Sequence, residues 1–500
     1  MTFLAVLAYV MPFPVHAQVS IAERSSPLRS DVGQLLGAPA LRVLDTVPGL
    51  LRVMQAASAL DDVSPTFRRY VVTAAHEAGA WRTPQEARRR DVLRVEADGR
   101  SVQGAWRLDG GVHYQRHADR DVMWRNQSAA SLLGGYVWAD SIGGTFRGDV
   151  LGLRAGVQRP LRSRAWAIGL PVDLSLGQEA RQNDPRPLVR RRVASVAPDL
   201  RWERGSQRVA VGATMEWTQE DLEIGGGVSP DVPLVYRLRG LATFDRTQLN
   251  SAERRLTGRA LGVRAGWQWQ RASSRFALGY SGRVTEDEVR DGIAAPVTGG
   301  ASRRQRHDLR LGWRHTARAH TLDVDAWWRH ETRRGTDPVF RAVNIDDEAM
   351  QTHAAATWWM GRSMDEAPWW LHVAAEQRTT QWRDLAAEAR WEIPRWQSRA
   401  ILGRQWHTAR GFLAAHGDVI WSPAPDAVSD VRRISPVWTQ LTQPWGAAFG
   451  AGAYGWGGGL SWRRQQTAAP WRVRADFTRW RADLPTAAAR SLWTLTLELR

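Results

Sequence analysis

Apolar and polar side chains alternate with a period of two from Trp166 to Leu176. One face carries Trp166, Ile168, Leu170, Val172, Leu174 and Leu176, and the other carries small or polar residues. Because successive side chains of a strand point to opposite faces, this pattern predicts a β-strand with one apolar side. Pro171 within the stretch removes one ladder donor. About eleven residues is the length that a tilted strand needs to cross a bilayer.

The same alternation recurs as far as the last residues. The runs that show it include 209–217, 263–269, 322–328, 473–477 and 493–499. Clusters of Gly, Asp, Asn and Pro separate them, as expected of turns and loops. The pattern predicts an all-β fold, a transmembrane antiparallel β-barrel of roughly 14–18 strands, with an even number expected. A soluble sandwich or propeller is the alternative, but its strands would be shorter and more evenly spaced.

The first 90 residues follow a different pattern. Residues 1–17 begin with an apolar run and end in Val15-His16-Ala17, which resembles a signal peptide without its usual basic start. Residues 18–90 carry apolar residues at helical spacing, interrupted by prolines. They predict short helices that form a periplasmic cap or a plug at the barrel mouth; a poorly ordered leader is the alternative. Residues 91–500 are expected to form the barrel.

Tryptophan is unusually abundant, with 28 residues against 7 tyrosines and 10 phenylalanines. Several lie near expected strand ends or in doublets, such as Trp327-Trp328 and Trp369-Trp370. The excess favours two girdles at the membrane interfaces, where indole rings are stable. A large aromatic core is the alternative interpretation.

The formal charge is +17, and all 68 basic residues are arginine. A G+C-rich genome is one explanation of that bias. The arginines alternate with apolar residues along the expected strands and do not form one patch, which argues against nucleic-acid binding. We expect Arg264, Arg472 and Arg474 to face the lumen and favour anions, and basic loops to meet the phosphates of outer-membrane lipid. The absence of cysteine excludes disulfides and thiol chemistry.

Residues 134–202 carry the motifs by which the chain resembles a known family. They are Tyr136-x-Trp138-Ala139-Asp140-x-x-Gly143-Gly144, a strand pair, and Asn183-Asp184-Pro185-Arg186-Pro187, preceded by Gly110-Gly111-Val112-x-Tyr114 and Trp124-Arg125-Asn126. The sequence is similar to an uncharacterised family of outer-membrane β-barrel proteins typical of Bacteroidota, although it is richer in arginine. The resemblance covers about a fifth of the chain. It implies a barrel in the outer membrane and brings no catalytic residues.

The loop motif Asn183, Asp184, Pro185, Arg186, Pro187 is expected to be rigid. Each proline fixes its own φ and biases the preceding residue towards an extended conformation. Asn183 or Asp184 can start a turn through its side chain. The motif predicts a loop that packs into or over the barrel end; the functional alternative is that Arg186 reaches the lumen and contacts an anion.

The sequence offers weak signals for metal binding and catalysis. His113 and His117 share a strand face near Asp119 and Asp121, but a metal site needs another fixed ligand. His416 with Asp418, and the acidic run 346–348, are fragments of a hydrolase rim site whose geometry spacing cannot show. No hydrolase, metalloprotease or phosphate-loop motif occurs. We therefore expect no metal, no cofactor and no catalytic residue.

The expected function is that of an outer-membrane pore, transporter or receptor for a small solute, with the lumen arginines favouring an anionic one. One alternative is a structural or partner barrel that accompanies a receptor or a surface lipoprotein, and another is a rim hydrolase acting on lipid or protein. The expected partners are outer-membrane lipid and the barrel-assembly machinery, because the final run 493–499 resembles a last-strand signal. Arg500 stands where such signals usually end in an aromatic residue.

Overall fold

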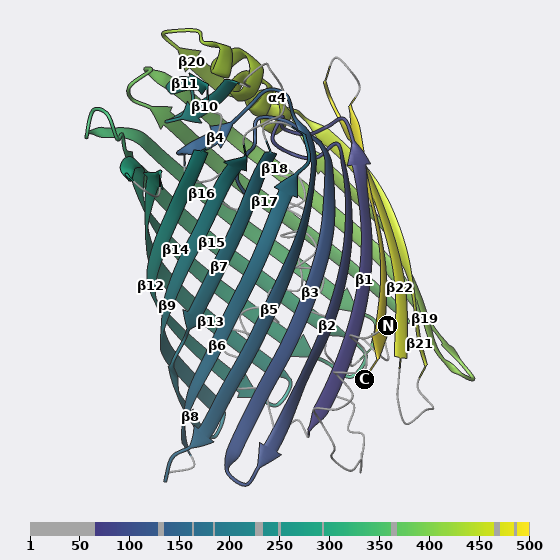
Figure 1. The fold of residues 1–500 in the computed structure, drawn as a ribbon. Helices are drawn as coiled ribbons and strands as arrows, with labels where there is room; N and C mark the ends of the chain where they lie inside the picture. Colours follow the sequence, from purple (N-terminus) through teal and green to yellow (C-terminus); the bar gives the residue numbers. More distant parts are fainter. Residues whose placement is uncertain are drawn as a thin grey trace, which may run out of the picture.

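Long antiparallel strands close into a single barrel in the computed structural model (Figure 1). The structure describes residues 66–128, 135–162, 165–183, 186–225, 234–248, 252–292, 295–361, 368–464, 471–484 and 488–499. The wall consists of β1 (Phe67–Gly79), β2 (Arg89–Gln103), β3 (Trp106–Val122), β5 (Gly144–Pro160), β6 (Trp166–Arg181), β7 (Arg186–Val196), β8 (Asp199–Arg204), β9 (Gln207–Gly225), β12 (Ala252–Arg271), β13 (Ser274–Asp291), β14 (Val297–Thr316), β15 (Thr321–Thr336), β16 (Val343–Trp359), β17 (Trp369–Asp384), β18 (Ala389–Thr408), β19 (Gly411–Ser422), β21 (Ala453–Arg464), β22 (Trp471–Ala482) and β23 (Ala489–Leu499).

The ring is closed because β1 pairs with both β2 and β23, with Tyr70 opposite Leu499. β7 and β8 are two parts of one strand, which gives 18 positions around the ring. Closure removes the unpaired edges that an open sheet would expose to lipid. The expected transmembrane barrel is therefore confirmed, at the upper end of the expected strand number.

Two prolines explain the break between β7 and β8. Val172 pairs with Val196 and Gly169 pairs with Asp199, so the register is unchanged across the break. Pro171 and Pro198 lie within it, and neither has an N–H to donate to the ladder. The Ala197 N–H still donates to the Pro171 carbonyl at 3.0 Å. The interruption is one of hydrogen bonding and leaves both faces of the strand in place.

The outer face of the wall carries an apolar belt bordered by tryptophan. Trp396 and Trp406 both point outward from β18, ten positions apart. At about 3.3 Å per residue and a tilt of about 45°, they are separated by ~23 Å along the barrel axis, close to the ~25 Å apolar band of such barrels. Outward Leu261, Val263 and Val419 lie within the belt. This is the arrangement that the tryptophan excess predicts.

The two ends of the barrel differ in the length of their connections. One end, the turn end, has tight turns such as Gln103–Trp106 and Thr408–Gly411, whereas the other, the loop end, carries the connections 123–143, 226–251 and 423–452. These loops contain β4 (Val137–Ala139), β10 (Leu234–Leu238), β11 (Phe244–Gln248), β20 (Val428–Val431), η3 (Trp438–Thr442) and α4 (Gln443–Gly450). No helix among the described residues is long and apolar enough to cross a membrane.

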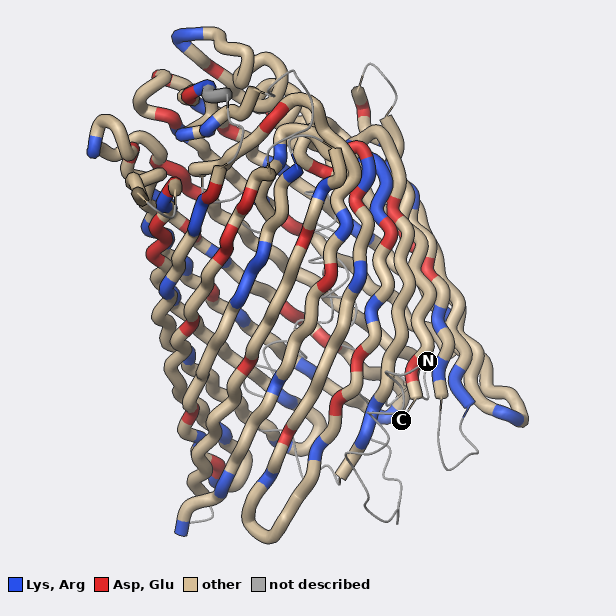
Figure 2. Tube along the Cα trace, viewed as in Figure 1, with Lys and Arg blue, Asp and Glu red and all other residues tan. Residues whose placement is uncertain are grey.

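Strands continue past the belt towards the loop end, where their outer face is charged. Cross-strand pairs there join Arg190 to Glu223 at 2.5 Å and Arg255 to Asp221 at 2.6 Å. Figure 2 shows acidic and basic positions intermingled over the wall. This part of the wall matches a polar, hydrated zone better than the interior of a bilayer.

The barrel starts earlier in the chain than the sequence indicates. β1 begins at Phe67 and β2 at Arg89, so residues 67–90 belong largely to the wall and correct the expected helical segment 18–90 and barrel start at 91. Tyr70 and Val72 point outward while Val71 and Ala75 are buried inside. Because apolar Val71 and Ala75 stand among the polar residues of the inner face, the contrast of period two is weakened there. The expected signal peptide 1–17 and the leader up to residue 65 lie outside the described residues.

An arginine in the belt tests this assignment of the outer face. Val263, 59% exposed at mid-belt, is expected to lose about 2–4 kcal/mol of unfolding free energy on replacement by arginine, because a charge at that depth meets hydrocarbon. Ile434, 76% exposed in the loop before η3, provides the control, and Ile434→Arg should change little. The measurement is denaturant unfolding in lipid vesicles. Equal effects of both changes would contradict a lipid-facing belt.

Candidate functional site

The loop end carries a structure that we call the lid, formed by residues 123–143, 234–248 and 432–452 as far as they are described (Figure 1). β4 pairs with β10, and β10 with β11, in a small antiparallel sheet separate from the wall. β4 belongs to the motif Tyr136–Asp140 that carries the family resemblance. The motif therefore forms part of the lid and not of a membrane-spanning strand.

Alternating side chains of β4 and its flank contact opposite sides. Trp138 packs against Val189, Leu222 and Ile224 on the inner faces of β7 and β9. Tyr136 packs against Leu256, Val289 and Ile345 on the inner faces of β12, β13 and β16. Val137 and Ala139 face the rest of the lid and pack with Trp124, Leu238, Val437 and Leu441. The segment thus lies inside the mouth of the barrel, against its wall.

The helical part of the lid closes the other side. Trp438 of η3 packs with Trp391 and Ile393 of β18. The indole Nε1 of Trp81, in the loop after β1, donates to the Ala448 carbonyl of α4 at 3.0 Å. The lid therefore contacts inner-wall residues on both sides of the mouth.

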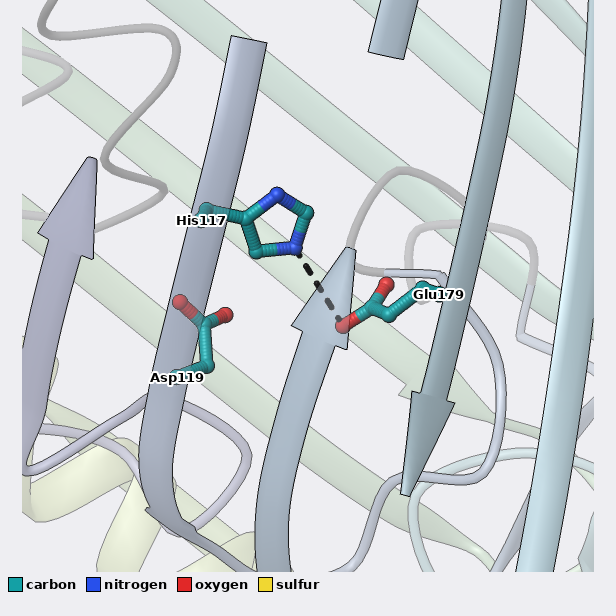
Figure 3. Close-up of side chains that lie close together, drawn as sticks. All are labelled: His117, Asp119 and Glu179. Atoms are coloured by element: carbon teal, nitrogen blue, oxygen red, sulfur yellow. Dashed lines mark ion pairs between the residues drawn. The ribbon is translucent and has the colours of Figure 1, made fainter. Parts of the chain in front are cut away.

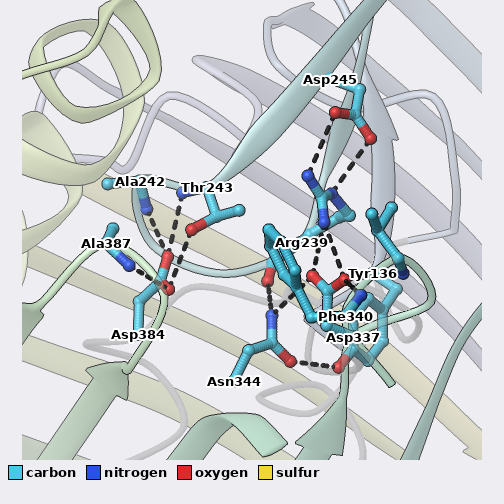
Figure 4. Close-up of polar contacts among 11 residues, drawn as sticks. Tyr136, Arg239, Ala242, Thr243, Asp245, Asp337, Phe340, Asn344, Asp384 and Ala387 are labelled. Atoms are coloured by element: carbon cyan, nitrogen blue, oxygen red, sulfur yellow. Dashed lines mark hydrogen bonds and ion pairs between the residues drawn. The ribbon is translucent and has the colours of Figure 1, made fainter. Parts of the chain in front are cut away.

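Tyr136 occupies a seat made by two glycines. A Cβ at Gly335 would lie 2.7 Å from the Tyr136 Oη, and a Cβ at Gly300 would lie 2.5 Å from the ring. The hydroxyl donates to Asn344 Oδ1 at 2.7 Å (Figure 4). Burial, together with the negative charge of Asp337, raises the pKa of Tyr136 well above its usual value, so the hydroxyl remains a donor.

A polar network joins the β10–β11 turn to the wall (Figure 4). Arg239 Nη1 donates to both carboxylate oxygens of Asp337, at 2.8 and 2.6 Å, and its Nε lies 3.0 Å from Asp245. Asp384, at the end of β17, accepts bonds from the N–H groups of Ala242 and Thr243 at 3.0 and 2.9 Å. Each buried charge in the network is thus met by an opposite charge or by backbone donors.

Asp140 fastens the end of β4 to the wall. Its carboxylate accepts from Arg181 Nη2 of β6 at 2.7 Å, and neither side chain is exposed. The same carboxylate accepts from the N–H groups of Ile142 and Gly143. A buried ion pair of this kind is costly to break, because removing one partner leaves an uncompensated charge.

Arg254 of β12 holds the middle of the lid. It pairs with Asp291 of β13 through two bonds, of 2.5 and 3.0 Å. Its Nη1 donates to the Tyr136 carbonyl at 3.0 Å, and its guanidinium lies 4.7 Å from the centre of the Trp138 ring. One wall residue therefore contacts the two aromatic residues of the motif.

A third anchor uses Arg125, which reaches from the lid to Glu179 of β6 and Asp119 of β3. His117, Asp119 and Glu179 place their ligand atoms within 4.8 Å of one another, a spacing that could hold a metal ion (Figure 3). However, Arg90 also lies 2.9 Å from Asp119, so two guanidinium groups already balance the two carboxylates. The arrangement suits an ionic anchor better than a cation site. Glu179 was not anticipated, since β6 is distant in sequence.

The three arginines expected in the lumen lie on inner faces of the wall, and two of them pair with nearby carboxylates. Arg264 lies on the inner face of β12, where its Nη2 donates to the Ala197 carbonyl at 2.8 Å and lies 3.2 Å from Asp199. Arg474 shares the inner face of β22 with Arg472 and pairs with Asp476 at 2.6 Å. Their proposed contact with an anion stays a prediction.

The loop motif is described in part. Asn183 and Arg186 are exposed and Pro187 is buried, while Asp184 and Pro185 lie outside the described residues. Arg186 begins β7 on the same outward face as Arg190, so the structure does not place it with the inner-face arginines. Alternate residues of β7 point to opposite faces, and position 186 falls on the outward one. The prolines on both sides of Arg186 obscured this alternation in the sequence.

A basic row on β14 was missed. Arg304, Arg306, Arg310 and Arg314 share its inner face, opposite outward Leu309 and Leu311. Asp308 is the acidic residue among them and pairs with Arg306 at 2.8 Å. The signal was present only in part, because Arg310 and Arg314 alternate with apolar residues in the final half of the strand, whereas Arg304 and Arg306 have polar neighbours. They form a basic track along one side of the lumen.

His416 and Asp418 lie on the inner face in the middle of β19 and not at a rim. Asp418 pairs with Arg399 at 2.7 Å, and His416 Nε2 lies 3.5 Å from Asp476. The two residues are thus part of the wall's ionic network.

Solved structures of similar shape include three proteins that are each 8–10% identical to this chain. The ferric yersiniabactin uptake receptor FyuA from Yersinia pestis has a TM-score of 0.44 and 10% identity, over 88% of this chain and 80% of that one. FpvA of P. aeruginosa, solved with pyoverdines, has 0.44 and 8%, over 86% and 71%. The ferric-catecholate import receptor Fiu from E. coli K12 has 0.41 and 10%, over 86% and 81%. At this level of likeness they say nothing of the solute.

No curated protein matches the sequence. A family profile, described as a family of unknown function (DUF6850), matches residues 56–500, which include every described strand. This agrees with the expected membership of an uncharacterised family. The chain belongs to the family of unknown function DUF6850.

Proposed function

We propose that this protein is an outer-membrane barrel for the uptake or reception of a small anionic solute, and that the lid is its gate on the cell surface. The observation that carries the proposal is the lid itself, which lies inside the barrel mouth and is fixed to the inner wall by buried charges. A closed mouth fits a gated or ligand-operated passage better than an open pore.

Location and orientation follow from the wall. A closed barrel with an apolar belt satisfies its backbone in lipid, and bacterial barrels of this type are found in outer membranes. Such barrels have short turns on the periplasmic side and long loops outside. The loop end with its lid is therefore proposed to face the exterior.

The preference for anions is supported by the track on β14. Arginine side chains lining a lumen raise the local concentration of anions and favour their passage. Carboxylates flank the track, with Arg314 paired to Asp323 at 2.6 Å and Arg304 lying 4.0 Å from Glu331. A solute that carries carboxylate or phosphate groups could exchange with these partners along the wall.

We also propose that the barrel is not an enzyme. The pair considered for hydrolysis, His416 and Asp418, faces wall residues of opposite charge in mid-strand. Acid–base work needs a group within reach of a bound substrate, and the described contacts already use the Asp418 carboxylate.

Ion selectivity in planar bilayers tests the proposal. The unmodified barrel is expected to be mostly silent, and a variant with the lid released by Asp140→Ala should show open steps that favour anions in a salt gradient. Adding Arg304→Gln and Arg310→Gln should abolish or reverse that preference, because the track loses two positive charges.

Arg303 provides a matched control, since it neighbours Arg304 on the outer face and is 60% exposed at its side chain. Arg303→Gln should leave selectivity unchanged. A steadily open unmodified barrel would contradict the gate, and equal shifts from both positions would contradict the track. A released barrel that is folded but silent would favour the partner-barrel role.

A further inference from the structure

The outer wall carries a hollow of about 650 Å³ where the last strand meets the first. It crosses β22, β23, β1, β2, β3 and β5, at the seam that closes the barrel. Ala74, Ala118 and Ala475 are among its lining residues, and their small side chains leave the space. Its lining residues Leu93, Arg116 and Trp493 lie on the outer face of the wall, away from the lid, and Val92 and His117, whose side chains point inward, border it as well.

The strand registers divide this surface into two rows. The first row reads Leu495, Ala74, Leu93, Arg116 and Asp149 across five of these strands, and the second reads Trp493, His76, Asp91, Ala118 and Arg147. Both rows are apolar on the β23 side and charged on the β3–β5 side. The surface is thus amphipathic, with a hollow at the junction.

Positive charge exceeds negative charge on the charged side. Arg116 lies 4.0 Å from Asp149 and is 68% exposed, a loose pairing. Asp91 is shared by His76 at 2.6 Å and Arg120 at 3.5 Å. Arg147 is exposed and forms no ion pair with any residue in the described parts of the chain. Guanidinium groups that are only partly neutralised favour phosphate, which they bind through charge-assisted hydrogen bonds.

The level in the membrane agrees with a head group. Outward Trp493 borders the hollow and, like other tryptophans of such barrels, is suited to the interface. Leu93 and Leu495, both outward and exposed, continue the apolar side. An acyl chain can lie over these side chains while a phosphate reaches the arginines.

We propose that this hollow is a binding site for a membrane lipid whose head group carries phosphate. The acyl chain lies over Leu93, Trp493 and Leu495, and the phosphate contacts Arg116 and Arg147. The ligand is a lipid and not a soluble anion, because the basic side is continuous with an apolar side that a soluble anion would leave uncovered.

The test measures binding of dioleoyl phosphatidic acid to the folded barrel in neutral detergent, by native mass spectrometry. A saturable site is expected for the unmodified protein, and dioleoyl phosphatidylcholine should bind more weakly. The double change Arg116→Gln and Arg147→Gln should weaken phosphatidic acid binding about thirty-fold, since each interfacial arginine raises the affinity roughly fivefold. Ala118→Leu, which fills the hollow without changing charge, should also weaken it.

Arg290 and Arg303 serve as the matched control, because both are outward and exposed elsewhere on the wall. Arg290→Gln with Arg303→Gln should leave binding unchanged. Equal losses in both double variants would overturn the site in favour of general surface charge. Full competition by inorganic phosphate, with Ala118→Leu without effect, would overturn the lipid assignment. Heat-modifiable migration on gels confirms that each variant is folded.

Discussion

Replacing Asp140 by alanine is expected to release the lid and turn a silent barrel into a conducting one. The change leaves Arg181 without its partner in a site where neither side chain is exposed, and it removes the acceptor for the Ile142 and Gly143 N–H groups. Breaking a buried pair in this way costs about 3–5 kcal/mol. If that cost falls on the closed lid, the ratio of open to closed barrels rises about 150- to 5,000-fold.

The measurement is single-channel conductance of the refolded protein, with lid exposure followed by trypsin cleavage. Asp173→Asn provides a control on β6, the strand that also carries Arg181. The Asp173 carboxylate lies 3.2 Å from Arg154, but this ion pair is largely exposed and stabilises the fold by only about 0–1 kcal/mol. It should neither open the barrel nor expose the lid. A variant at Asp140 that is cleaved in the lid yet remains silent would contradict the gate and favour the partner-barrel role.

The second large effect is expected from a single methyl group at Gly335. Its Cβ would lie 2.7 Å from the Tyr136 Oη and 3.0 Å from the Ile345 Cβ, so Gly335→Ala should push Tyr136 out of its seat. Overpacking of this kind lowers the free energy of unfolding by about 1–3 kcal/mol. The bond to Asn344 is lost as well, which leaves a buried acceptor without its donor. Thermal melting and trypsin cleavage of the lid should both occur at lower temperature.

Gly177 on β6 is the matched glycine, since a Cβ there would meet its neighbours at 3.5 Å or more. Gly177→Ala is expected to be neutral or slightly stabilising, because alanine has less freedom to lose on folding. A Gly335→Ala protein with an unchanged melting temperature would show that Tyr136 does not depend on its seat.

The barrel could be predicted from the sequence because its strands obey a simple physical rule. Where one face meets lipid and the other meets polar groups, as in β6 and β12, the period of two is plain in the sequence. The rule fails for β1, where buried Val71 and Ala75 alternate with polar Thr73 and Glu77 on the inner face. Apolar residues on both faces weaken the contrast that the rule detects.

The candidate site was only partly predictable. The motif around Trp138 and Asp140 was recognised as characteristic, but nothing local shows that it turns back into the mouth. Its partners Arg181, Arg254 and Asn344 come from distant strands, and no spacing rule connects them. Likewise, the alternation along each strand predicts that Arg264 and Arg474 point inward. Their pairing with Asp199 and Asp476 depends on how neighbouring strands pack.

The distance along the chain between the lid's contacts has a consequence for biogenesis. Tyr136 and its partner Asn344 are 208 positions apart, and Asp384 holds a turn that precedes it by 142 positions. Non-local contacts of this kind form late, because the intervening chain must be ordered first. The segment with β4 precedes β5 in the chain, but Tyr136 has no complete binding surface until β16 is in the sheet, and the β10–β11 turn also needs β17. We therefore expect the newly inserted barrel to pass through an unsealed stage, in which the membrane is transiently leaky before the last step of maturation.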